Sequence, residues 1–287
     1  MTRIAYVNGA YVRTAEAGVS IEDRGFQLAD GVYEVCEIRH GYIVDLTRHL
    51  NRLDRSLSEI RIAQPMSRKA LVAIIRQVIH RNHVKNGLFY LQVTRGAARR
   101  DHVFPSPETK PTVVVTAKRT DASLIARKNA DGIRAVTVPE NRWDRVDIKT
   151  VGLLPNVLAR QQAKEAGAQE AIFIDANGRV TEGAATNVWI VDKDGALRTR
   201  PADHGILRGI TRTTLQDVAT KIGLKIEERA FTVEEMLAAR EVFITAATSI
   251  CFPVVAVDGQ PIANGHPGST AQKIREAFFD VAEKTLI

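Results

Sequence analysis

Cysteine is scarce in this sequence, with Cys36 and Cys251 the only two in 287 residues. One pair of thiols excludes a disulfide scaffold and a cysteine-based metal site, and we expect both to pack in the core. Long apolar runs are also absent: no stretch approaches about 18 consecutive apolar residues, and residues 1–9 lack the apolar segment of a signal peptide. We therefore expect a cytoplasmic protein that binds neither a membrane nor a metal.

Runs of four basic residues are absent too, although the formal net charge is +7. The excess lies in residues 1–120, where 19 Lys and Arg stand against 11 Asp and Glu, while the remainder carries 21 against 22. The basic positions are not interleaved with aromatics, as a platform for single-stranded nucleic acid requires. This distribution favours a small anionic ligand, and a basic nucleic-acid-binding protein is the alternative from a different class.

The size and composition of the chain predict an ordinary globular protein with two domains. Hydrophobic residues make up 45% and charged residues 25% of the chain, which is enough for a sizeable core. We predict the α+β class, with a small N-terminal α+β domain at 1–120, a polar connector at 121–132 and a larger domain at 133–287. In the larger domain strands and helices do not simply alternate, which favours a bent or barrel-like sheet.

Turn residues and hydrophobic periodicity predict the individual elements. In the first domain we expect a hairpin at 4–12 around Asn8-Gly9, a hairpin of 32–38 with 42–46 around His40-Gly41, a helix through Leu46, Leu50, Leu53 and Leu57, a helix capped by Ser67 and stopped at Gly87, and strands at 88–95 and 112–117. In the second we expect strands at 133–139, 171–175, 180–191, 241–247 and 254–257, hairpin turns at Asn177-Gly178 and Asp194-Gly195, and helices after Pro155, after Ile210, over 232–239 and from Gly268 to the carboxyl terminus.

Lys149 is the first candidate for chemistry. It ends the stretch Val146–Lys149, which has the pattern of a short apolar strand, and a helix can begin soon after it at Pro155. Burial lowers the pKa of an amine, and an uncharged lysine is the nucleophile that forms Schiff bases with aldehydes. For a lone lysine a surface position is the commoner explanation, so the companions of Lys149 decide its meaning.

Glu182 and two loops offer possible partners for a cofactor. Glu182 could pair with a heterocyclic nitrogen, or it could face solvent on a strand edge. The segment Leu207–Thr211 leads into a predicted helix, where Gly209 allows close backbone approach and free amides bind phosphate. Glycine and a capping threonine are also routine structural features of a helix start. The stretch Thr245–Ser249 could form the facing half of this phosphate cup or a plain polar turn.

Four further side chains could bind an anion or a substrate. Arg52, beside His49 on the first long predicted helix, could aim its guanidinium at an anion or lie in solvent. Arg100 and His102 stand two residues apart in a loop after a strand, which suits a carboxylate trap, although a mobile basic loop is an equal alternative. Tyr33 could offer its phenol to a pocket or fill the core.

In their order and spacing these segments resemble fold-type IV pyridoxal-phosphate aminotransferases, and most of all the bacterial D-amino-acid transaminases. The resemblance spans nearly the whole chain and is far more specific than any single motif. Its densest segments are Glu22–Phe26, Asp30–Val35, His49–Leu53, Val93–Gly96, Arg100–His102, Asp147–Lys149, Leu153–Ala159, Thr181–Gly183, Asn187–Val188 and Leu207–Arg212.

The resemblance implies pyridoxal 5'-phosphate as cofactor and a role for each candidate. Lys149 would form the aldimine and Glu182 would meet the pyridine nitrogen. The cofactor would also contact Arg52, Leu207, Gly209, Ile210, Thr211, Ala247 and Thr248, and the substrate would contact Tyr33, Tyr90, Arg100 and His102. The Arg-x-His pair would reach across from the partner subunit of a homodimer. The implied reaction is ping-pong transamination between a D-amino acid and a 2-oxo acid, pyruvate or 2-oxoglutarate.

Other activities of the same fold remain open. L-branched-chain aminotransferases and aminodeoxychorismate lyases share the lysine and the phosphate cup but generally lack the Arg-x-His pair, and an amine transaminase is a third alternative. The chain departs from many relatives at Ala184-Ala185 and Ala246-Ala247, where hydroxyl residues are common around the cofactor. Backbone amides or the Thr248 hydroxyl would then supply those contacts.

Overall fold

A computed structural model describes residues 3–287 of the chain, which pack into two compact units. Unit 1 comprises Met1–Thr120, Ile148–Gly152 and Glu283–Ile287, and unit 2 comprises Asp121–Asp147 and Leu153–Ala282. Two short segments, one of which carries Lys149, therefore belong to unit 1, although the boundaries expected from the sequence place them in the second domain. Residues 121–132, expected to be a connector, belong to unit 2.

Unit 1 is built on a seven-stranded antiparallel sheet with the strand order β16-β4-β3-β5-β6-β1-β2. Both predicted hairpins are confirmed, and the residues at their turns, Asn8-Gly9 and His40-Gly41, all have positive φ, which asparagine and glycine tolerate well. The strands are β1 (Ile4–Val7), β2 (Ala10–Arg13), β3 (Gly31–Arg39), β4 (Tyr42–Val44), β5 (Gly87–Thr94), β6 (Thr112–Arg119) and β16 (Lys284–Leu286).

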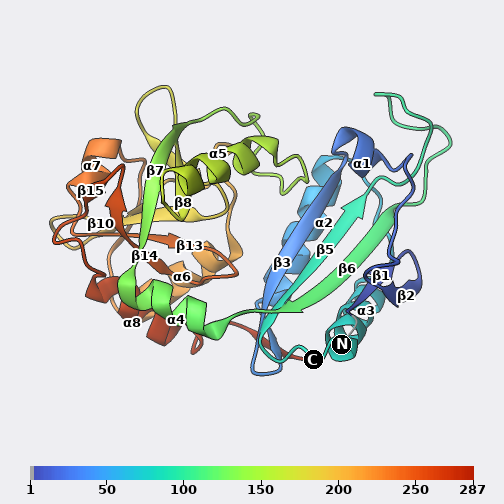
Figure 1. The fold of residues 1–287 in the computed structure, drawn as a ribbon, viewed down its shortest axis with the longest axis horizontal. Helices are drawn as coiled ribbons and strands as arrows, with labels where there is room; N and C mark the ends of the chain where they lie inside the picture. Colours follow the sequence, from blue (N-terminus) through green and yellow to red (C-terminus); the bar gives the residue numbers. More distant parts are fainter. Residues whose placement is uncertain (1–2) are drawn as a thin grey trace. The chain divides into compact units, whose positions relative to one another are not determined.

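Two long helices, α2 (Leu46–Glu59) and α3 (Arg68–Arg81), cover one face of this sheet (Figure 1), and the short α1 (Arg24–Leu28) precedes β3. The predicted leucine stripe of α2 is buried, with Leu53 1% and Leu57 0% exposed, and each such leucine contributes roughly 2 kcal/mol. The Ser67 hydroxyl caps α3, as predicted, by accepting from the amide of Ala70 at 3.3 Å.

Gly87 has a different role from the predicted one, because it opens β5 instead of stopping α3. The helix ends at Arg81, and a Cβ at position 87 would overlap the carbonyl oxygen of Lys118 on the neighbouring strand β6. The glycine therefore permits close pairing of two strands, a requirement that a helix-stop pattern does not reveal.

Unit 2 is built on a nine-stranded mixed sheet with the order β12-β11-β10-β13-β14-β7-β8-β9, and β15 pairs with β14 off this path. The pairs β11–β12, β14–β7 and β7–β8 are parallel. Strand β9, at one end of the order, contacts β10, so the sheet curls as expected for a barrel-like sheet. The strands are β7 (Ile133–Pro139), β8 (Glu170–Ile174), β9 (Val180–Gly183), β10 (Asn187–Val191), β11 (Leu197–Thr199), β12 (Ile226–Glu228), β13 (Glu241–Thr245), β14 (Phe252–Val257) and β15 (Gln260–Pro261).

The helices of unit 2 include one that the sequence did not predict. This is α4 (Ala122–Asp131), capped by the Asp121 carboxylate. The predicted strand 180–191 is two strands separated by a turn at residues 184–186, and the predicted carboxyl-terminal helix ends at Phe278, before β16. The other helices are α5 (Leu154–Glu165), α6 (Ile210–Lys221), α7 (Val233–Leu237) and α8 (Ser269–Phe278).

Each unit has its own apolar core. The core of unit 1 lies between its sheet and helices α2 and α3, and that of unit 2 includes the facing residues of β10, β13 and β14. Cys36 and Cys251 are buried free thiols, as predicted. None of the helices formed by residues 3–287 is both long and apolar enough to cross a membrane.

Candidate active site

A short segment of unit 1, Ile148–Gly152, holds Lys149 beside β3. The amide of Tyr33 donates to the carbonyl of Lys149 at 3.0 Å, and the amide of Val151 donates to the carbonyl of Gly31 at 3.0 Å. The strand predicted at Val146–Lys149 is wrong, because residues 144–147 form a turn. Lys149 does not lie in a strand. Two backbone hydrogen bonds to β3 fix the main chain of its segment.

The side chain of Lys149 lies over an aromatic pair. Its Nζ is 4.2 Å from the centre of the Tyr33 ring, and the Tyr33 and Tyr90 rings stack with centres 5.6 Å apart. Lys149 is half-buried, which lies between the buried position and the surface position considered from the sequence. Burial, reinforced by Tyr33, raises the pKa of Tyr90 to about 12, and its hydroxyl donates to Gln92 Oε1 at 2.6 Å. The face of the Tyr33 ring thus lies directly against the amine of Lys149.

Arg52 on α2 is bound to a buried carboxylate. Its Nε donates to Glu34 Oε1 and its Nη2 to Glu34 Oε2, both at 2.8 Å, and Glu34 Oε2 also lies 2.7 Å from His49 Nδ1. Burial alone would raise the pKa of Glu34, but the charge and hydrogen bonds of Arg52 and the bond to His49 lower it to about 2. Arg52 is thus a buried, oriented cation that is joined to β3 through Glu34.

Arg100 and His102 are exposed in the loop between β5 and β6. Within residues 3–287 no hydrogen bond or ion pair of either side chain connects it to Lys149, Tyr33 or Tyr90. The structure therefore brings together Lys149, Tyr33 and Tyr90, but it does not add the predicted Arg-x-His pair to them within one chain.

Glu182 is buried on β9 in unit 2, which rules out the solvent-facing edge position. Its carboxylate accepts from Arg142 Nη1 at 2.6 Å, from Asn187 Nδ2 at 3.1 Å, and from the amide of Leu207 at 3.1 and 3.2 Å. The Asn187 amide group also donates to the carbonyl of Leu207 at 2.9 Å. Asn187 thereby joins Glu182 to the loop before α6, so these predicted cofactor residues do lie together.

Sequence reasoning missed Arg142 and Glu140, which support Glu182. Arg142 donates through Nε and Nη2 to Glu140 at 2.8 and 2.6 Å, and its guanidinium stacks on Phe173 at 4.4 Å. Burial alone would lower the pKa of Arg142, but its bonds and charge interactions with the two carboxylates raise it. A Glu-x-Arg pair directly after β7, at residues 140–142, was the available signal.

The start of α6 has the form expected for an anion-binding site. Gly209 is the N-cap residue, and a Cβ there would overlap Asn187 Oδ1, so only glycine fits this close approach. Ile210 and Thr211 form the buried first turn, where amides have no acceptor within the helix. The helix macrodipole adds partial positive charge at the same point.

The turn after β13 lies at the same end of the sheet. In the β10–β13 register Thr245 pairs with Asn187, so residues 246–249 continue beyond the position of Asn187. Ala247 is half-buried and Thr248 is exposed, which disfavours the Thr248 hydroxyl as an inward phosphate contact. Ser249 is the better candidate, because its hydroxyl is buried without a hydrogen-bond partner among residues 3–287.

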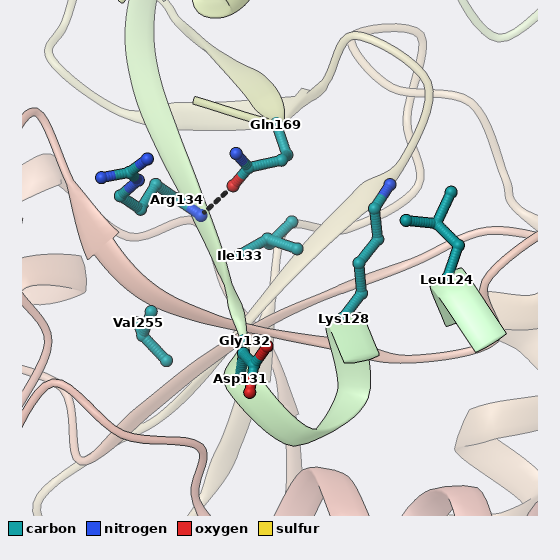
Figure 2. A pocket seen from close by; sticks show the side chains of 8 residues that line it. All are labelled: Leu124, Lys128, Asp131, Gly132, Ile133, Arg134, Gln169 and Val255. Carbon is teal, nitrogen blue, oxygen red and sulfur yellow. Dashed lines mark hydrogen bonds between the residues drawn. The ribbon is translucent and has the colours of Figure 1, made fainter. Parts of the chain in front are cut away.

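A separate open pocket of about 430 Å³ in unit 2 contains none of these residues (Figure 2). It lies where α4 leads into β7, and the side chains that line it come from Leu124, Lys128, Asp131, Gly132, Ile133, Arg134, Gln169 and Val255. No predicted site residue lies in this pocket, so we do not identify it with the candidate active site.

Comparison with known proteins gives consistent matches over the whole chain. The family model for class IV aminotransferases matches residues 31–257. The D-alanine aminotransferase of Staphylococcus haemolyticus is 38% identical over 97% of both chains, and that of Bacillus licheniformis is 40% identical over 94% of both. Among solved structures, the branched-chain amino acid aminotransferase of Escherichia coli has a TM-score of 0.90 at 26% identity, covering 98% of this chain and 95% of its own. The T.th. branched-chain enzyme with pyridoxamine 5'-phosphate has a TM-score of 0.88 at 27% identity, covering 98% and 94%.

Proposed function

The chain belongs to the class IV aminotransferases, and from this premise we propose that it transfers amino groups between D-amino acids and a 2-oxo acid, pyruvate or 2-oxoglutarate, in a ping-pong cycle. One observation carries the choice of D-amino acids. Relatives named D-alanine aminotransferase are 38% and 40% identical over nearly their full length, whereas the branched-chain structures are 26% and 27% identical. The fold alone does not separate these classes, because it is common to both.

Pyridoxal phosphate, the cofactor of this family, fits the residues at the start of α6 and around Glu182 in unit 2. The phosphate needs donors, and the amides of the first turn of α6 and the Ser249 hydroxyl, which has no hydrogen-bond partner among residues 3–287, would supply them. Gly209 leaves room for a close approach of the backbone. The basic ring nitrogen needs a carboxylate partner, and Glu182, whose carboxylate is held by Arg142, would be that partner. Arg52 would be the second phosphate ligand and Lys149 the amine that attaches to the aldehyde.

Each protein group would then have one task. When bound, the cofactor withdraws electrons and so weakens the Cα–H bond of an attached amino acid. The Lys149 amine, held beside Tyr33, would remove the proton from Cα and deliver it to the carbon that was the aldehyde carbon of the cofactor. Glu182 would keep a proton on the ring nitrogen. Arg100 and His102 from the partner subunit would bind the substrate carboxylate.

The first test is a visible absorbance spectrum of the purified protein with pyridoxal phosphate, recorded before and after addition of D-alanine, L-alanine or L-leucine. We expect D-alanine, and neither L-amino acid, to shift the band of the bound aldehyde to that of pyridoxamine phosphate. Bleaching by L-leucine would move the assignment to the branched-chain enzymes, which the structural neighbours make the second candidate. A preparation that acquires no band would refute the cofactor assignment.

Lys149→Ala tests the catalytic amine directly. The folded variant should lose the absorbance band of covalently attached cofactor and all turnover of D-alanine, while its far-ultraviolet circular dichroism stays unchanged. Lys118→Ala, which removes a lysine from an exposed position on β6, is the control and should keep both. Full activity of Lys149→Ala would contradict the proposal.

The proposed sharing of the site requires a homodimer, and we also propose that the protein is cytoplasmic. The exposure of Arg100 and His102 within one chain supports this arrangement, because among residues 3–287 neither side chain is bonded to Lys149, Tyr33 or Tyr90. Light scattering should give twice the mass of 31.6 kDa for one chain. Mixing an inactive Lys149→Ala chain with an inactive Arg100→Ala chain should restore part of the activity if the site is shared.

A further inference from the structure

Arg24 on α1 lies beneath the loop that carries Arg100 and His102. Its side chain is only 3% exposed, and its Nη1 donates to the carbonyl of Asp101 at 2.6 Å and to the carbonyl of Val103 at 3.3 Å. These two carbonyls flank His102 in the chain. A single buried guanidinium thus holds the loop backbone on both sides of one member of the Arg-x-His pair.

The residues around Arg24 hold the beginning of the same loop. The amide of Arg24 donates to the carbonyl of Gly96 at 2.9 Å, and the amide of Ala98 donates to the carbonyl of Glu22 at 3.2 Å. The Asp23 carboxylate caps α1 and accepts from the Thr94 hydroxyl at 2.8 Å. Figure 1 shows α1 at the end of the sheet where β5 passes into this loop.

The shared carboxylate of Asp30 explains why Arg24 also donates to the loop carbonyls. Its Nε donates to Asp30 at 2.8 Å, but Asp30 is shared with Arg95, which donates to it at 2.7 and 3.0 Å. Two buried guanidinium groups therefore face one carboxylate, and carbonyl oxygens compensate the remaining positive charge. Arg95 uses those of Ile60 and Arg61, and Arg24 uses those of the loop.

A second contact holds the loop just beyond Val103. The guanidinium of Arg95 stacks over the Phe104 ring, with 3.7 Å to the ring centre. Both arginines are bonded to Asp30, so the loop from Asp101 to Phe104 rests on one connected buried group of charges. The mobile basic loop considered from the sequence is thus clamped at its backbone, and its side chains at Arg100 and His102 project to the surface.

We infer that Arg24 is a positioning residue for recognition of the substrate carboxylate. It fixes the backbone beside His102 before substrate arrives, so that less conformational entropy is lost when Arg100 and His102 bind a carboxylate. Arg24 itself would contact neither substrate nor cofactor, because its guanidinium binds Asp30 and the loop carbonyls. The inference rests on the proposed function for the identity of the ligand, but the ordering of the loop by Arg24 stands apart from it.

The test compares Arg24→Gln with Arg99→Gln and Arg24→Lys. Arg99→Gln removes the same charge from an exposed position of the same loop and leaves the clamp intact. Arg24→Lys keeps a buried cation, and it replaces Arg24→Gln in the test if that variant does not fold. Two measurements are made on the loaded dimer: hydrogen exchange of peptides covering residues 97–105, and the inhibition constant of propionate, a carboxylate without an amino group, against D-alanine.

We expect Arg24→Gln to speed exchange in this peptide and to raise both the propionate inhibition constant and the KM for D-alanine by roughly tenfold, a change that mainly reflects lost preorganisation. The value of kcat should change much less, and Arg24→Lys should recover part of the effect. Arg99→Gln should leave the exchange unchanged.

Unchanged exchange in both Arg24 variants would overturn the clamp. Faster exchange with an unchanged propionate constant, or an equal loss in kcat and kcat/KM, would overturn its role in carboxylate recognition. If the wild-type protein does not turn over D-alanine, the proposed function fails, while the exchange measurement still decides whether Arg24 orders the loop.

Discussion

Replacement of Glu34 by glutamine tests the charge balance beneath β3. Glu34 is 1% exposed and its pKa is lowered from 4.5 to about 2, with burial opposed by the charge and bonds of Arg52 and His49. At about 1.4 kcal/mol per unit of pKa, this lowering of the Glu34 pKa corresponds to roughly 3 kcal/mol of unfolding free energy. Glu34→Gln should therefore destabilise the protein by about that amount at pH 7, because the guanidinium of Arg52 loses the carboxylate charge to which it donates two hydrogen bonds.

The pH dependence has a definite sign. The pKa of Glu34 is lower in the folded protein than in the unfolded chain. Its stabilising contribution to the free energy of unfolding is therefore complete above about pH 5 and is lost as the pH falls towards 2. The difference in unfolding free energy between the wild-type protein and Glu34→Gln should shrink at pH 3 to roughly half of its value at pH 7. Glu37, on the same strand, has a pKa raised by burial to about 7, so Glu37→Gln is the control with the opposite sign and should stabilise the protein at pH 8.

Urea unfolding must report on unit 1 to measure this effect. The only tryptophans, Trp143 and Trp189, lie in unit 2, so their fluorescence follows that unit. Hydrogen exchange in peptides of β3 supplies the signal from unit 1. A Glu34→Gln protein within about 1 kcal/mol of wild type at pH 7, or one equally destabilised at pH 3 and pH 7, would refute the assigned role of the carboxylate.

Two further substitutions test unit 2. Gly209→Ala forces its new methyl group onto Asn187 Oδ1 and should weaken binding of pyridoxal phosphate at least tenfold in equilibrium dialysis. The control Gly18→Ala places its methyl group in open space and should not change binding. Equal binding by both variants would show that the close approach at the start of α6 does not contribute to cofactor binding. Arg142→Met leaves Glu182 without its buried cation and should cost about 3–5 kcal/mol in urea unfolding followed by tryptophan fluorescence; a loss under 1 kcal/mol would show that the pair is unimportant for stability.

The elements that sequence reasoning found are those with a local cause. Asn8-Gly9 bends a hairpin because both residues accept positive φ, and the leucines of α2 specify a helix because their spacing matches its buried face. The strand β16 was missed because its structure depends on pairing with β4, some 240 residues earlier in the chain. Residues 284–286 carry no strong pattern of their own.

The same distinction applies to the candidate site. Glu182 and the start of α6 could be found because family motifs mark them, and Asn187 joins them in the structure. Arg142 could not be ranked from the sequence, since its importance comes from two carboxylates, one of them 40 residues away. The half-buried position of Lys149 could not be predicted for a related reason: a turn and two backbone hydrogen bonds to β3 place this segment, and its own sequence does not encode them.

The path of the chain also sets an order of events during synthesis. Unit 1 needs residues 148–152 for the segment beside β3 and residues 283–287 for its edge strand β16, and most of unit 2 is encoded between these two segments. A ribosome therefore releases the first 120 residues long before their sheet can be completed. Until then the edge of β4 is open, and the Asp45 amide and carboxylate lack the Glu283 backbone partners that they have in the finished protein. The nascent chain must keep this edge from pairing with other strands while unit 2 is still being made.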